Sequence, residues 1–346
     1  MSSGERNNRI TRRELLCGAA AAASAVGISH FAKGRAAYAR SSGSVVPVVV
    51  TQRKSHRDAI EAALNRIGGL RSIKRGDKVL LKVNTNSGDP FPYSSSPEMI
   101  RYLGARLRDH GATVVVGDRS FWGDPNTLAN LEANGIGAAA RSVAAKVVAF
   151  EGDDIAWKKI PSHLVPHWRG SVRVPRLVTD CDYVINLPCV KTHFITTYTM
   201  ALKNVLGLVH PVDRARKGNL RTHAQARIYK QVADINRFVR SHLIVLDGYR
   251  ALVSGGPTPQ SGAKPRVVKA GIVIASTDPV AVDAVGIALL RMLSPKTERV
   301  TGYRTWGNPM VRAAVAARVG ISSPEQMRID ASGVSRLSTL RKLSVS

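Results

Sequence analysis

The stretch Asp182-Tyr183-Val184-Ile185-Asn186-Leu187-Pro188-Cys189-Val190-Lys191-Thr192-His193 decides both the fold and the place of the site. Residues 182–187 are typical of a buried β-strand, because β-branched, aromatic and aliphatic side chains fill their centre. Residues 188–193 follow with a proline and then a lysine, a threonine and a histidine. Ligands of open α/β sheets bind outside the carboxyl ends of the strands, so this order predicts a site directly after a strand.

Similar apolar stretches lie on both sides of this strand, and stretches with helical spacing separate them. We expect further strands at 45–51, 78–83, 112–117, 146–150, 243–246 and 267–275. We expect helices at 56–67, 96–110, 126–145, 196–208, 224–239, 278–293 and 309–319. Strands that alternate with helices at this spacing predict an α/β fold with a largely parallel sheet flanked by helices. The Gly- and Pro-rich stretch 248–265 is interpreted as a flexible loop.

Polar side chains follow five of the expected strands. The first of these residues at each strand end are Lys82, Asp118, Lys191, Asp247 and Ser276. The two lysines are informative, because burial disfavours the charge of a lysine unless an anion is near.

The densest polar patch runs from residue 191 to residue 207. If the chain is helical from Thr196 onward, Thr196, Thr199 and Lys203 lie near one face of the helix. The hydroxyl groups of Thr192 and Thr196 would cap that helix. A helix start with hydroxyl groups nearby and a preceding Lys and His predicts an anion site.

The same residues resemble a known family. The stretch 186–193 and the later Thr199 and 203–207 are similar to the pattern N-x-P-x-x-K-T-H…T…K-N…G of the domain of unknown function 362 family. Supporting similarities lie at 82–84, 247–248, 255–257 and 275–283. The resemblance covers about residues 45–295 and implies an α/β domain with a site built from these residues. It supplies no reaction.

Some members of that family carry ferredoxin-like cysteine clusters, and this sequence lacks them. Only Cys181 and Cys189 follow residue 39, which is too few for a four-cysteine iron–sulfur site within one chain. In an extended strand they would lie about 26 Å apart, at ~3.3 Å per residue, which is beyond disulfide reach. The cofactor is left open, and a metal ion is compatible with the sequence.

We assign roles to the polar residues as follows. The catalytic candidates are His193, Lys191 and Asp247, with His193 as general acid or base because the pKa of histidine lies near working pH. The ligand-binding candidates are Lys82, Asn84, Thr192, Thr199, Lys203 and Asn204. The candidate metal ligands are Asp118, Asp283 and His210, although no spacing such as HExxH occurs.

The N-terminus is typical of a twin-arginine signal peptide. Arg12 and Arg13 precede a weakly apolar run over 15–28, further basic residues and the sequence Ala37-Tyr38-Ala39. This order predicts a signal peptide over 1–39 that the Tat translocase recognises, followed by a linker over 40–44. We therefore expect an exported protein, periplasmic or extracellular, with an α/β domain over 45–295 and a helical segment and basic tail over 296–346.

The chain is strongly basic. Its 346 residues carry a formal charge of +27, and +23 remains without residues 1–39. This charge favours an anionic partner, either a small molecule or an envelope polyanion, and nucleic acid is not expected for an exported protein. Three hypotheses stay open: an enzyme or binding domain for an anionic small molecule, a redox or metal-dependent accessory protein exported with its cofactor, and a non-enzymatic polyanion-binding protein.

Overall fold

The structure is a computed structural model that describes residues 45–121, 126–152, 154–219, 225–261, 263–295 and 302–346. The predicted signal peptide and linker, residues 1–44, lie outside the described residues. None of the helices in these described ranges is both long and apolar enough to cross a membrane.

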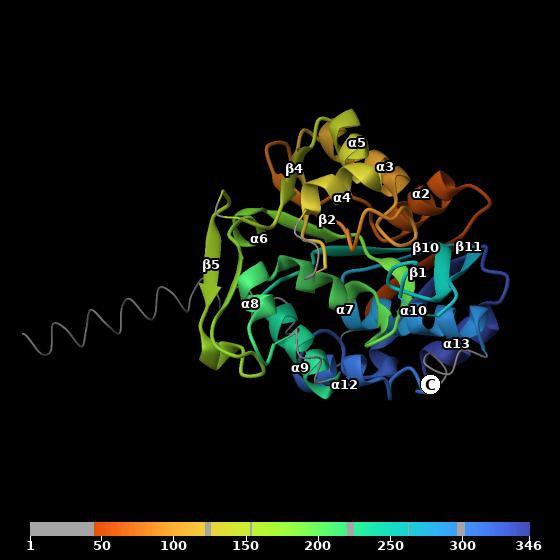
Figure 1. Cartoon of the computed structure of the whole chain (residues 1–346). Helices are drawn as coiled ribbons and strands as arrows, with labels where there is room; N and C mark the ends of the chain where they lie inside the picture. Colours follow the sequence, from red (N-terminus) through yellow and green to blue (C-terminus); the bar gives the residue numbers. More distant parts are fainter. Residues whose placement is uncertain (1–44, 122–125, 153, 220–224, 262, 296–301) are drawn as a thin grey trace, which may run out of the picture.

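One large sheet organises the chain (Figure 1). Its strands are β1 (Val46–Gln52), β2 (Lys78–Lys82), β3 (Thr113–Asp118), β4 (Lys146–Ala149), β7 (Tyr183–Asn186), β8 (Cys189–His193), β9 (Thr197–Thr199), β10 (Leu243–Ser254), β11 (Arg266–Ser276) and β12 (Met327–Ser332). They lie in the order β12-β1-β11-β10-β7-β2-β3-β4, and β8 pairs with β10 and with β9. Only β9 and β11 run antiparallel to their neighbours, so the predicted largely parallel sheet is confirmed.

Helices cover both faces of the sheet, as the sequence predicts. On one face lie α2 (His56–Arg66), α3 (Pro97–Asp109), α4 (Thr127–Ala133) and α5 (Ile136–Ser142). On the other lie α7 (Ala201–Asn204), α9 (Gln225–Asn236), α10 (Pro279–Leu293), α12 (Pro309–Ala316) and α13 (Leu337–Ser344). The shorter α6 (Leu177–Asp180) and α8 (Pro211–Ala215) lie in the connections.

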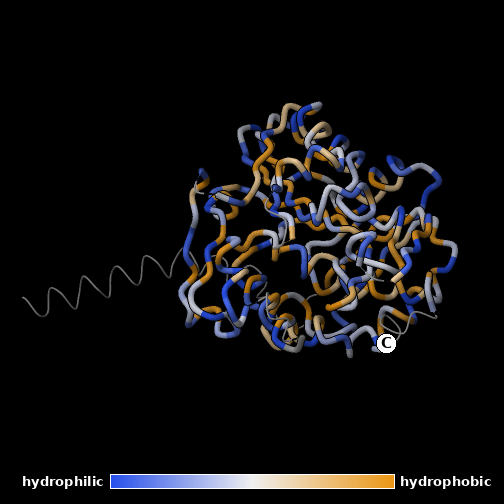
Figure 2. Tube along the Cα trace, in the orientation of Figure 1, coloured by the Kyte–Doolittle hydropathy of each residue, from blue (hydrophilic) through white to orange (hydrophobic). Residues whose placement is uncertain are grey.

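Side chains that alternate along each strand build two separate cores. In β2, Val79 and Leu81 join the core under α2 and α3, whereas Leu80 joins the core under α10. Many hydrophobic residues lie in the interior of the molecule, and many hydrophilic residues lie at its periphery (Figure 2). Two helices begin with side-chain caps: the Ser96 hydroxyl accepts from the first turn of α3, and the Asp278 carboxylate accepts from the first turn of α10.

The predicted helix over 196–208 is wrong in its first part. Residues Thr197–Thr199 form strand β9 against β8, and α7 begins only at Ala201. The β-branched threonines of this stretch favour extended backbone, and pairing with β8 fixes them there. Thr196 therefore does not cap a helix; its hydroxyl donates to the carbonyl of Tyr198.

The stretch 248–265 also differs from the expectation. Strand β10 continues to Ser254 beside β11, so the first third of the expected loop is sheet. Gly256 lies against β8, where an added Cβ would come within 2.0 Å of the Thr192 carbonyl oxygen. The glycine here allows close packing rather than flexibility.

Two further segments contain strands that the sequence did not reveal. Residues 151–175, for which we expected neither a strand nor a helix, include β5 (Trp157–Ile160) and β6 (Val172–Pro175), which form a small antiparallel sheet. The basic C-terminal tail contributes β12, which pairs with β1, and α13, which packs against α10.

Candidate functional site

A cavity of about 260 Å³ lies where β2, β3 and β8 end. Its polar lining comes from Asn84, Thr85, Asn86, Asp118, Arg119, His193, Thr199, Lys203, Asn204 and Arg214. Apolar residues of the wall include Phe121, Phe194, Ile195, Leu206 and Ile228. The carboxyl edge of the sheet thus carries the cavity, as the rule for open α/β sheets predicts.

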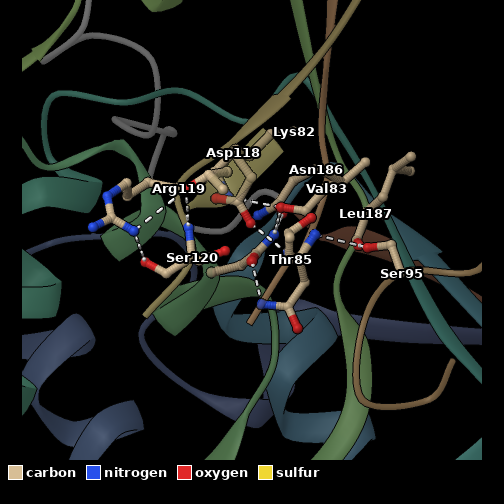
Figure 3. Close-up of polar contacts among 12 residues, drawn as sticks. Lys82, Val83, Thr85, Ser95, Asp118, Arg119, Ser120, Asn186 and Leu187 are labelled. Carbon is tan, nitrogen blue, oxygen red and sulfur yellow. Dashed lines mark hydrogen bonds and ion pairs between the residues drawn. The ribbon is translucent and has the colours of Figure 1, made fainter. Parts of the chain in front are cut away.

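A buried ion pair forms one wall. The Lys82 Nζ atom lies 2.7 Å from Asp118 Oδ1, and both side chains are at most 3% exposed. Lys82 also donates to the carbonyl of Val83, and Asp118 Oδ2 accepts from the backbone N–H of Thr85 (Figure 3). Burial lowers the pKa of Lys82, although Asp118 acts in the opposite direction. Lys82 is absent from the cavity lining and is committed to Asp118, so the structure supports a positioning role rather than the predicted contact with a ligand.

The structure shows why the family pattern ends in a glycine, which is Gly207 in this chain. A Cβ at this position would lie 1.9 Å from Asp118 Oδ1 and 2.9 Å from Lys82 Nζ. Only glycine lets the 3₁₀ turn η2 (Val205–Leu208) pack directly on the ion pair.

Three asparagines form a chain of hydrogen bonds behind the cavity. Asn186 donates to the carbonyl of Ala201, and its Oδ1 accepts from Asn204 Nδ2 at 2.8 Å. Asn204 Nδ2 also donates to the carbonyl of Val83, and its Oδ1 accepts from Asn84 Nδ2 at 3.0 Å. Both Asn84 and Asn204 line the cavity, but the two N–H groups of the Asn204 amide are already used in this chain of hydrogen bonds.

Two cations face the cavity without an ion-pair partner among the described residues. Lys203 Nζ donates to the Thr199 hydroxyl at 3.3 Å, and Arg214 donates to the carbonyl of Ser120. Burial lowers the pKa of Lys203 well below its ordinary value, and the nearby positive charges of Lys191 and Arg214 lower it further. Burial also lowers the pKa of Arg214 to about 10.

Several polar atoms in this lining have no hydrogen-bond partner among the described residues. They are Asn84 Oδ1, Thr85 Oγ1, Asn86 Nδ2 and Arg214 Nε. Asn84, Thr85 and Arg214 are at most 8% exposed. Buried polar atoms normally have partners, so the lining of the cavity keeps unused hydrogen-bonding capacity.

His193 also lines the cavity, as predicted. Its Nδ1 atom accepts from the backbone N–H of Ile195 at 3.0 Å, and its ring stacks on Phe194. Because Nδ1 is an acceptor, the proton of the neutral ring lies on Nε2. This arrangement makes His193 a hydrogen-bond donor, and a general base at Nδ1 would have to give up the contact with Ile195.

Lys191, Thr192 and Asp247 do not line the cavity. Lys191 is fully buried and donates to the carbonyl of Tyr93, and burial lowers its pKa to about 8. The Thr192 hydroxyl accepts from the N–H of Gly256, which fastens the loop after β10. Lys191 and Thr192 share strand β8 with His193, and this is why the sequence suggested a joint role for them.

Asp247 instead pairs with a residue that the sequence analysis did not single out. His56 Nε2 lies 2.9 Å from Asp247 Oδ2, and the His56 ring stacks between Phe91 and Tyr249. His56 opens α2, far from Asp247 in the sequence, and its position there gave no signal of the contact.

The three candidate metal ligands are not brought together. Asp283 accepts from the N–H groups of Ala201 and Leu202 at the start of α7, and burial raises its pKa to about 7 against the effect of these bonds. His210 caps α8, and Asp118 is committed to Lys82. In the ranges that the structure describes, no three His, Cys, Asp or Glu side chains are grouped so that they could hold a metal ion.

Arg214, Thr85 and Asn86 belong to the cavity but were not assigned to it from the sequence. Thr85 and Asn86 follow β2 directly, so their position at a strand end was the available signal. Arg214 lies in a basic stretch of the connection around α8, where an arginine is normally a solvated surface residue. Only the folded chain brings it to the end of β3.

Fold and site together define an α/β protein with a cationic cavity at the carboxyl edge of a mostly parallel sheet. The chain belongs to the family described as Domain of unknown function (DUF362), whose pattern matches residues 79–288.

Two similar proteins illustrate the family and the fold. The chain is 28% identical to the Thylakoid-associated protein sll1697 of Synechocystis sp. over 243 residues, which cover 69% of this chain and 71% of the relative. It also resembles the lactate racemase apoprotein from Thermoanaerobacterium thermosaccharolyticum, with a TM-score of 0.37 and 12% identity, over 66% of this chain. That match spans 55% of the racemase chain.

Proposed function

We propose that this protein binds a small oxyanion, or a small molecule that carries one, in the cavity at the carboxyl edge of the sheet. The observation that carries the proposal is the pair Lys203 and Arg214. Both cations line the cavity, and neither has a carboxylate partner among the described residues. Lys203 is partly buried and Arg214 is buried, and such surroundings disfavour the charge of a cation unless an anion compensates it.

The other lining groups support the same ligand. Arg214 Nε and Asn86 Nδ2 are donors that have no partner in the described part of the chain, and an oxyanion accepts hydrogen bonds from such groups. The apolar residues Phe194 and Ile228 leave room for the rest of a small molecule.

The test is calorimetric titration of residues 40–346 with inorganic phosphate and with sulfate. We expect binding that the Lys203→Met variant weakens by about tenfold or more, because a hydrogen bond to a charged group is lost in a buried site. The matched control is Lys230→Met, which removes the same charge from an exposed position on α9.

If both variants weaken binding equally, the protein attracts anions through its overall charge, and the cavity is not the site. Binding that collapses with modest salt would point to the same conclusion and would favour the polyanion hypothesis.

A further inference from the structure

Asn84 lines the cavity together with the donors Lys203 and Arg214, and its side-chain oxygen is a hydrogen-bond acceptor without a partner among the described residues. We propose that Asn84 selects oxyanions that carry a hydroxyl hydrogen beside their charged oxygens, the chemistry shared by hydrogen phosphate and 2-hydroxycarboxylates. This inference rests on the proposed function and names the class of ligand within it.

The chain of asparagines fixes which atom Asn84 presents. The carbonyls of Ala201 and Val83 can only accept, so the Nδ2 atoms of Asn186 and Asn204 must point at them. The atom of Asn204 that faces Asn84 is therefore Oδ1, and an oxygen can only accept a hydrogen bond from Asn84. The amide of Asn84 therefore points its Nδ2 at Asn204, and it cannot rotate without placing two acceptors face to face.

The Oδ1 atom of Asn84 remains as a buried acceptor of a residue that lines the cavity. Asn84 is 8% exposed, and its Oδ1 has no partner among the described residues. Its backbone is held in place as well, because its N–H donates to the Ser95 hydroxyl and its carbonyl accepts from the Ser95 N–H. A rigid buried acceptor penalises a ligand that brings only acceptors.

The cations beside it fix the rest of the ligand. Lys203 and Arg214 supply donors and positive charge, which suit the charged oxygens. A ligand that satisfies the whole lining must therefore accept from these cations and donate to Asn84. Sulfate and acetate have no hydrogen to donate at neutral pH, whereas hydrogen phosphate and glycolate do.

The experiment compares two matched pairs of probes on the wild-type protein at neutral pH: phosphate with sulfate, and glycolate with acetate. We expect the hydroxyl-bearing member of at least one pair to bind more tightly by about fivefold or more, since the other member leaves a buried acceptor unpaired. Sulfate carries at least as much negative charge as phosphate, so charge alone cannot produce this preference. A preference for phosphate over sulfate would identify a phosphate-type ligand. A preference for glycolate over acetate would identify a 2-hydroxycarboxylate.

The outcomes separate this inference from the proposed function. Equal affinity within each pair, weakened by Lys203→Met, overturns the selection by Asn84 and leaves the anion site in place. Absence of binding by all four probes contradicts both. In the Asn84→Leu variant we expect the preference within the discriminating pair to disappear while the affinity for the other member does not fall, and a preference that survives this substitution also overturns the inference.

Discussion

The protonation of Lys203 should change when an anion binds in the cavity. Burial and neighbouring cations lower its pKa in the free protein, and a bound anion acts in the opposite direction. Binding should therefore take up a proton, and affinity should fall as pH rises through the interval between these two pKa values.

This pH dependence is measured by titrating sulfate into the wild type between about pH 6 and about pH 9, where the charge of sulfate is constant. We expect a steady loss of affinity with pH that is absent from Lys203→Met. A wild-type affinity that stays flat over this range would show that Lys203 does not change protonation on binding.

The ion pair of Lys82 and Asp118 should behave as one unit. Lys82→Met leaves a buried carboxylate without its cation and should lower the free energy of unfolding by about 3–5 kcal/mol. The double variant Lys82→Met with Asp118→Asn should regain much of this loss, because no unpaired charge remains. Urea unfolding of the four proteins of this cycle checks the prediction, and additive losses would contradict it.

At the scale of elements, β8, β9 and α7 bring His193, Thr199, Lys203 and Asn204 to the cavity. Asn84, Asp118, His193, Thr199, Lys203 and Asn204 were candidates from the sequence, and all six line the cavity. The first three lie at or just after the ends of parallel strands, which meet at one edge of the sheet. The sequence analysis missed β9, since three-residue strands have too short a pattern to compete with the helical spacing around them.

Gly207 in η2 tests how closely this turn must pack on the ion pair of Lys82 and Asp118. In Gly207→Ala the added methyl group would overlap Asp118 Oδ1, and we expect a loss of about 1–3 kcal/mol or more in unfolding free energy. The matched control is Gly307→Ala, where the nearest atom to an added Cβ lies at 3.5 Å. Similar stability of the two variants would show that η2 does not depend on close contact with the ion pair.

At the scale of the whole molecule, long-range contacts limited what could be predicted. Arg214 reaches the cavity from the connection before α9, and His56 reaches Asp247 from the start of α2. Neither contact leaves a periodic pattern in the sequence. The pairing of β12 with β1 is of the same kind, because a polar edge strand near the end of the chain resembles a solvated tail.

Export remains a prediction that the full-length chain can test. Replacing Arg12 and Arg13 by lysine should prevent export, because the twin arginine is the feature that the Tat translocase recognises. Replacing Arg6 and Arg9 in the same way is the matched control and should leave export intact. Fractionation of a bacterium with a Tat system gives the readout, and processed protein outside the cytoplasm for both double variants would contradict the predicted route.

The central claim, that an oxyanion binds between Lys203 and Arg214 beside Asn84, is tested most directly by anomalous diffraction. Crystals of residues 40–346 would be soaked with arsenate, which has the charge and the hydroxyl group of phosphate and an anomalous signal of its own. The account predicts an arsenic peak in the cavity, with arsenate oxygens within hydrogen-bond distance of Lys203 Nζ, Arg214 Nε and Asn84 Oδ1. Arsenic peaks confined to the exposed surface, with none in the cavity, would contradict it.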